Sequence, residues 1–243
     1  TNPAVVAYDP AFAFELGHIV KDGLRRMYGE NSENVYYYLT VYNEPYVHPA
    51  EPENLDVEGL LKGIYLYSPA PKSRKKSAQI LASGVGVNWA IKAQQLLADD
   101  WGVKASVWSV TSWNELRRDG LETDRHNLLN PKDKRTAYIT KKLDGAKGPV
   151  IAVSDYMRAV QDQISPWVQQ PFYSLGTDGF GLSDTRGALR RHFNVDAESI
   201  AVAVLQQLCN QGDVKQSIVT KAMNKYRIHD VSAADAGNTE GSG

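Results

Sequence analysis

The sequence contains a single cysteine, Cys209, among 243 residues, and it has no long uninterrupted apolar stretch. One cysteine cannot form an internal disulfide, and such sparse use is typical of a reducing compartment. No run approaches the roughly 18 apolar residues of a membrane span, and no secretory signal is present. We therefore expect a cytoplasmic protein that does not interact with a membrane.

An excess of either charge is also lacking. The chain has 27 Lys and Arg against 28 Asp and Glu, which gives a net charge of −1. This balance offers no basic surface for a nucleic acid, so we expect no nucleic-acid partner. The length suffices for one large domain or two modest ones. Because the chain begins without Met, in the run TNPAVVAYDP, we expect a fragment or a processed piece.

Two segments differ in their patterning. In residues 1–67, the pattern predicts a helix from Pro10 to Gly29, a strand over 34–45 and a short helix over 56–65. The strand is so continuously apolar that we expect it to be buried rather than at a sheet edge. Residues 68–76 are charged and rich in proline, and we expect a linker there. Residues 230–243 lack large apolar side chains after Val231, which predicts a disordered tail.

Strands and helices alternate through the second segment, residues 77–229. The pattern predicts strands over 78–84, 103–112, 149–155 and 171–177, with helices between and after them. Ser112, followed three residues later by Glu115, is typical of a helix N-terminus. Alternation of this kind predicts an α/β fold with a mostly parallel sheet covered on both faces.

Glu44 and His48 form an E-x-x-x-H pair directly after the first predicted strand. Pro45 and Pro49 exclude a regular helix across the pair, and no third ligand is close in sequence, so we predict no metal site. The spacing alone favours a solvated loop. The alternative is that the strand end projects an acid and an imidazole into a ligand-binding cleft.

Three other motifs have ordinary structural interpretations. Tyr8, before Asp9 and Pro10, is more typical of a packed aromatic residue than of a catalytic group. The Gly84-Val85-Gly86 turn carries the bulky Trp89 where a dinucleotide fingerprint needs a third glycine, so it predicts a tight strand-to-helix turn. The run 190–192, Arg-Arg-His, is interpreted as a charged helix end that needs no ligand.

The residues alone do not specify a reaction, but several long runs are distinctive. They are AYDPAFAFELGHIVKDGLRRMYG, ENVYYYLTVYNEPY, WSVTSWNELRRDGLETDRHN, SDYMRAVQDQISPWV and LGTDGFGLSDTRGALRRHFNVDAESI. Together they resemble the carboxyl-terminal part of the homodimeric bacterial pyruvate dehydrogenase components, in an actinobacterial-like form. That family belongs to the transketolase-like superfamily, and the resemblance covers nearly the whole chain.

The resemblance implies a fold and a cofactor. Residues 1–67 would be the end of a pyrimidine-binding domain, and residues 77–229 a transketolase-type carboxyl-terminal domain. The family uses thiamine diphosphate and Mg²⁺. Its diphosphate motif, G-D-G followed by N-N, does not occur here. We therefore expect both to be bound mainly by sequence outside this chain.

The resemblance also implies an activity, site residues and partners. The complete enzyme would decarboxylate pyruvate and reductively acetylate a lipoyl group. Tyr8 would lie at the cofactor and substrate pocket, and Glu44 and His48 would manage protons near the reacting centre. The partners would be the remainder of the enzyme, a second copy, and a lipoyl-bearing dihydrolipoyl acyltransferase. The alternative is a non-catalytic dimerisation or assembly module of a transketolase or 2-oxoglutarate dehydrogenase.

Overall fold

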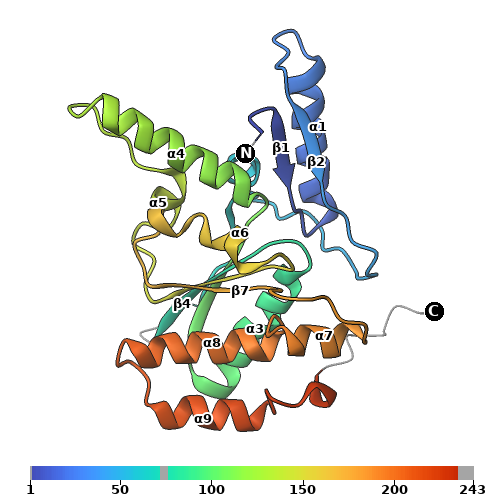
Figure 1. Cartoon of the computed structure of the whole chain (residues 1–243), viewed down its shortest axis with the longest axis vertical. Coiled ribbons are helices and arrows are strands. Elements are labelled where there is room, and N and C mark those ends of the chain that lie inside the picture. Colours follow the sequence, from blue (N-terminus) through green and yellow to red (C-terminus); the bar gives the residue numbers. More distant parts are fainter. Residues whose placement is uncertain (1, 72–75, 235–243) are drawn as a thin grey trace.

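Two sheets organise the computed structural model, which describes residues 2–71 and 76–234 (Figure 1). The smaller sheet pairs β1 (Val5–Tyr8) with β2 (Tyr36–Leu39) in parallel. The larger sheet has the strand order β3-β5-β4-β6-β7. Its strands are β3 (Tyr65–Ser68), β4 (Ser77–Ala82), β5 (Lys104–Ser109), β6 (Val150–Val153) and β7 (Phe172–Leu175).

All pairs in the larger sheet are parallel except β3 with β5, which confirms the predicted α/β class with a mostly parallel sheet. The predicted strand regions overlap β4 to β7, whereas β1 and β3 were not predicted. β3 begins at Tyr65, where the predicted helix over 56–65 ends.

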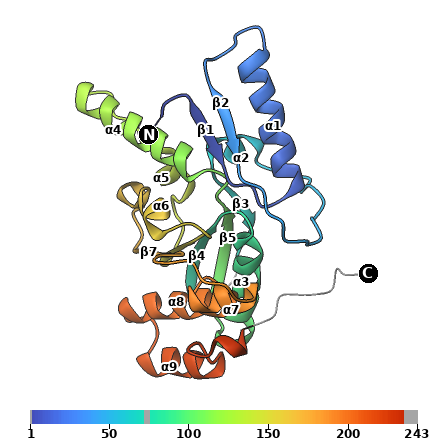
Figure 2. The same ribbon diagram turned by 45° about the vertical axis from the view of Figure 1, so that its right-hand side comes forward.

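Helices cover both faces of the larger sheet. Ribbons α4, α5 and α6 lie on one side of it, and α8 and α9 lie on the other (Figures 1 and 2). The helices are α1 (Ala13–Tyr28), α2 (Val57–Lys62), α3 (Gly86–Trp101), α4 (Trp113–Leu129), α5 (Tyr138–Lys142), α6 (Arg158–Asp162), α7 (Arg186–His192), α8 (Ala197–Asn210) and α9 (Gln216–Lys225), with 3₁₀ turns at Ser165–Trp167 and Val231–Ala233.

The larger sheet and the helices that cover it are here called the larger domain. Its two cores follow from the two-residue period of the strands. Ile80 of β4 packs into the core that α3 and α8 cover, whereas its neighbour Leu81 packs into the core under α4 and α5. Successive side chains of a strand point to opposite faces, so a strand buried on both sides carries apolar residues at nearly every position. At the start of α4, the Ser112 hydroxyl accepts the Glu115 N–H at 3.0 Å, which confirms the predicted cap.

The small sheet forms a separate β-α-β unit with α1 between its strands. Val6 and Ile19 are fully buried in its core together with Leu60 of α2. The burial predicted for the strand over 34–45 is wrong for the described chain, because β2 pairs only with β1 there and Tyr38 is 59 % exposed. The predicted strand is also too long, since regular pairing ends at Leu39, six residues before Pro45.

The domain boundaries at residues 67 and 77 stay predictions. β3 (Tyr65–Ser68) crosses the first boundary and pairs with β5 in the larger sheet. Part of the predicted linker, 72–75, and most of the predicted tail, 235–243, lie outside the described residues. Among the described residues, no helix is both long and apolar enough to cross a membrane.

Candidate functional site

Two adjacent cavities share the segment that follows β2. The first, here called the α1 cavity, has a volume of about 180 Å³ and lies between the start of α1 and residues 40–48. The second, here called the α7 cavity, has about 280 Å³ and lies between residues 42–44, the segments after β6 and β7, and α7. Tyr42 and Glu44 line both cavities, so they form the wall between them.

Glu44 and His48 both line the α1 cavity, so the structure brings these two predicted residues together. The carboxylate of Glu44 is held by the Arg190 guanidinium: Nη1 donates to Oε1 at 3.1 Å and Nη2 donates to Oε2. Both oxygens therefore have a charged donor, and the pair is mostly shielded from solvent. Fork-to-fork pairing of this kind fixes the orientation of a carboxylate as well as its charge.

The imidazole of His48 is oriented by the start of α1. Its Nδ1 accepts the backbone N–H of Ala13 at 3.1 Å. A neutral ring that accepts at Nδ1 carries its proton on Nε2, which leaves Nε2–H as a donor. The ring also packs against Tyr46, with centroids 4.6 Å apart. The Tyr46 hydroxyl donates to the Ala11 carbonyl, and burial raises the pKa of Tyr46 to about 12.

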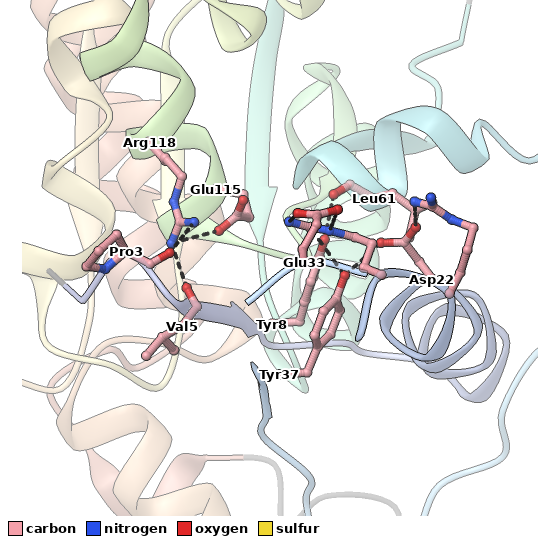
Figure 3. Close-up of polar contacts among 11 residues, drawn as sticks. Pro3, Val5, Tyr8, Asp22, Glu33, Tyr37, Leu61, Glu115 and Arg118 are labelled. Atoms are coloured by element: carbon pink, nitrogen blue, oxygen red, sulfur yellow. Dashed lines mark hydrogen bonds and ion pairs between the residues drawn. The ribbon is translucent and has the colours of Figure 1, made fainter. Parts of the chain in front are cut away.

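Tyr8 lines neither cavity. Its ring stacks on Tyr37 at 5.8 Å, and its hydroxyl donates to the Leu61 carbonyl at 2.6 Å (Figure 3). Burial raises the pKa of Tyr8 well above its usual value. Figure 3 also shows Arg118 donating to the carbonyls of Pro3 and Val5, which ties β1 to α4. In this structure Tyr8 therefore lies apart from Glu44 and His48, in the core of the small β-α-β unit.

Asp9 anchors the segment that carries Glu44. Its buried carboxylate accepts hydrogen bonds from Thr40 Oγ1 at 2.5 Å, Tyr42 Oη at 2.5 Å and Ser83 Oγ at 2.6 Å. Burial and the Asp9 charge raise the pKa of Tyr42 strongly, so its phenol remains a hydrogen-bond donor. Asp9 thus joins the segment after β2 to the end of β4.

Gly84 explains the glycine turn after β4. Its φ is +52°, and a Cβ at this position would lie 2.1 Å from the Tyr42 hydroxyl. Only glycine permits both this conformation and this close approach. The predicted tight turn is therefore correct, and its glycine makes room for the Tyr42 side chain from the segment after β2.

A buried carboxylate, Glu15, stabilises the start of α1 beneath the site. It accepts the backbone N–H groups of Ala11 and Phe12 and the hydroxyls of Tyr65 and Ser109. Burial raises the pKa of the Glu15 carboxyl, and these four donors oppose that rise. The arrangement closes the backbone turn that presents Ala13 N–H to His48.

The α1 cavity, with about 180 Å³, is smaller than the pockets of roughly 300–1,000 Å³ that hold most small-molecule ligands. Within 2–71 and 76–234, no group of three or more His, Cys, Asp and Glu side chains could hold a metal ion. The arrangement can instead orient a small polar ligand through an imidazole donor beside a fixed carboxylate.

Sequence reasoning missed Arg190 and Tyr42. Arg190, Arg191 and His192 form the basic last turn of α7, which confirms the predicted charged helix end. Arg190 and Arg191 are nevertheless only 8 % and 2 % exposed, and Arg191 pairs with Asp196. No local pattern of the sequence indicates that Arg190 has a partner 146 residues away.

Comparison with protein families gives two matches. The family described as "Transketolase-like TK C-terminal domain" matches residues 63–196, more than half of the chain. The family described as "Pyruvate dehydrogenase E1 component middle domain" matches residues 1–49. The second match covers the small sheet and the segment with Glu44 and His48.

Similar curated proteins carry the name "Pyruvate dehydrogenase E1 component". One from Mycolicibacterium smegmatis is 61 % identical over 235 residues, which cover 96 % of this chain and 25 % of that protein. One from Mycobacterium tuberculosis is 56 % identical and covers 99 % and 26 %. The protein from Escherichia coli K12 is 44 % identical and covers 94 % and 26 %. The chain thus spans about a quarter of the length of these relatives.

Similar solved structures are transketolases. A transketolase from Pichia stipitis superposes with a TM-score of 0.58 at 18 % identity, covering 88 % of this chain and 26 % of that one. A split-gene transketolase, described as an inactive β4 tetramer, gives 0.56 at 16 % identity and covers 85 % and 59 %. At this level of identity the likeness concerns the fold alone.

Proposed function

We propose a function from one premise: this chain belongs to the transketolase-like C-terminal domain family, and it matches about a quarter of pyruvate dehydrogenase E1 components. The complete protein would be such a component, which decarboxylates pyruvate with thiamine diphosphate and transfers the acetyl group to a lipoyl group. The observation that carries this proposal is the shared α1 cavity of Glu44 and His48, in a chain 61 % identical to a protein of that name.

In this proposal the chain supplies one wall of the reaction site. The Nε2–H of His48 donates to an oxygen of the keto acid, and its orientation is preset by the Ala13 N–H on Nδ1. Glu44, held by Arg190, provides a fixed negative charge and an acceptor beside it. Fixed groups of this kind lower the entropic cost of reaching the reactive geometry.

The catalytic and cofactor-binding role of Tyr8 stays a prediction. Its phenol already donates to the Leu61 carbonyl, and the residue is only 3 % exposed. Both facts support a packing role. Thiamine diphosphate and Mg²⁺ would be held mainly by sequence outside this chain, in keeping with the small α1 cavity.

The proposed partners are the remainder of the enzyme, a second copy of it, and a lipoyl-bearing dihydrolipoyl acyltransferase. The names of the relatives support a multi-component enzyme, since each is called a component. We place the enzyme in the cytoplasm, with the single cysteine as the supporting observation.

A second candidate is a non-catalytic assembly module. The observation that favours it is the engagement of both Glu44 oxygens by Arg190, since a structural ion pair would look the same. Loss of activity on a change that preserves the fold separates the two candidates.

The test uses the complete enzyme with Glu44→Gln and His48→Asn. Glu44→Gln keeps the side-chain size, and His48→Asn keeps an acceptor near the position of Nδ1 but removes the Nε2–H donor. We therefore expect pyruvate decarboxylation to fall at least about tenfold with little change in the thermal midpoint. Glu51→Gln is the matched control, because Glu51 lies on the same loop, is exposed, and pairs with His18 rather than lining either cavity. Unchanged decarboxylation in both test variants would favour the assembly module.

A further inference from the structure

Arg190 belongs to the larger domain, yet its side chain reaches Glu44 in the segment after β2. It lies on α7 and has a side chain only 10 % exposed. Its guanidinium carbon is 4.7 Å from the centre of the Trp89 ring, and Trp89 lies in the first turn of α3. The guanidinium is therefore placed between an aromatic face and the Glu44 carboxylate.

These contacts leave Arg190 little freedom. An Arg side chain can stack on an aromatic face while its edge forms two parallel hydrogen bonds with a carboxylate. Here the face contacts Trp89 and the edge contacts Glu44, so two elements of the larger domain fix one side chain of the segment after β2. Since residues 40–48 have no regular secondary structure, side-chain contacts hold that segment in place. This contact and the Asp9 cluster act there together with the hydrogen bonds of Tyr46 and His48 to residues 11 and 13.

We infer that Arg190 is a positioning residue for the reaction: it holds the Glu44 carboxylate in a fixed orientation in the wall of the α1 cavity. The inference rests on the proposed function and extends it, because the larger domain then completes the site rather than only supporting assembly. Glu44 in this arrangement acts as a fixed acceptor and not as a proton donor, since both its oxygens face cationic N–H groups. Arg190 itself acts only through Glu44.

Loss of a purely structural ion pair would also lower activity if it destabilised the fold. The test must therefore measure the coupling between the changes at Glu44 and Arg190. We propose a double-mutant cycle in the complete enzyme with Glu44→Gln, Arg190→Gln and both changes together. The kcat and KM for pyruvate and the thermal midpoint are measured for each variant. Arg227→Gln is the matched control, because the Arg227 side chain is exposed, pairs with Asp230 and lines neither cavity.

We expect Arg190→Gln and Glu44→Gln each to lower kcat at least about tenfold, while the double variant falls no more than about twofold below Glu44→Gln alone. Arg227→Gln should stay within about twofold of the unchanged enzyme. Arg190→Lys should recover part of the loss, since an ammonium restores the charge but not the two-pronged geometry. If Arg190→Gln does not fold, the same cycle is run with Arg190→Lys.

Two results would overturn the inference while leaving the proposed function intact. One is a large loss for Glu44→Gln with normal turnover for Arg190→Gln. The other is an additive cycle, in which the Arg190 change lowers kcat by the same factor whether residue 44 is Glu or Gln. Unchanged turnover for both Glu44→Gln and His48→Asn would remove the proposed function itself, and the inference with it.

Discussion

The carboxylate of Asp9 accepts a hydrogen bond from the hydroxyl of Ser83 at 2.6 Å, across 74 residues of sequence. This contact joins the end of β1 to the end of β4, and the backbone supports it, since Gly84 N–H donates to the Asp9 carbonyl at 3.1 Å. Thr40 and Tyr42 donate to the same carboxylate. One buried acid thus connects both sheets with the segment that carries Glu44.

The first prediction concerns this cluster. Replacing Asp9 by Ala removes the acceptor of three hydroxyl groups, and we expect the free energy of unfolding to fall by about 2–4 kcal/mol. Chemical denaturation of the variant measures this loss. Thr40→Val is the control, because it removes one donor of the three and should cost only about 1 kcal/mol. Equal, small losses for both variants would show that Asp9 does not hold the junction.

The alternation of strands and helices after residue 77 was predictable because each strand is buried on both faces and each long helix has an apolar side. The exposure of β2 was not, since an apolar run does not show how many neighbours a strand has. The number of strands that pair with β2 is set by the tertiary fold, and the residues of the strand itself do not indicate it.

The candidate site was predictable in part. Glu44 and His48 were singled out because they follow a strand end, where α/β proteins place ligands. Their shared cavity depends on the turn at Pro10 and Ala13, which the sequence does not show. Arg190 could not be assigned, because its pairing joins positions 146 residues apart and depends on how the two domains pack.

The second prediction addresses Tyr8. Changing it to Phe removes the hydrogen bond to the Leu61 carbonyl but keeps the ring that stacks on Tyr37. We expect a loss of about 1 kcal/mol in unfolding free energy and decarboxylation within about twofold of the unchanged enzyme. Denaturation and steady-state kinetics on the complete enzyme measure the two effects. A fall in turnover beyond about tenfold with normal stability would assign the phenol to catalysis instead.

The third prediction is a pH dependence that arises from Glu15. Burial raises the pKa of this carboxyl above its model-compound value of 4.5, so the folded state binds a proton more readily than the unfolded state does. The contribution of Glu15 to stability is therefore fully present below about pH 4.5 and is lost as the pH rises through the raised value. Glu15→Gln does not titrate and lacks this dependence.

Urea unfolding of the unchanged protein and of Glu15→Gln, from about pH 5 to about pH 8, measures the effect. We expect the stability difference, unchanged protein minus variant, to decrease as the pH rises. A difference that increases with pH would mean that the four donors around Glu15 outweigh its burial.

In the proposed function, residues 40–48 form a wall of the pyruvate site. Hydrogen exchange of the complete enzyme, with thiamine diphosphate and Mg²⁺ present, tests it when a phosphonate analogue of pyruvate is added. This segment has no regular structure and includes Val47, which is 91 % exposed, so its free amides should exchange quickly. We predict that the analogue slows exchange there at least about tenfold and leaves α9 unchanged. Unaltered exchange over 40–48, with protection confined to other parts of the enzyme, would contradict the claim.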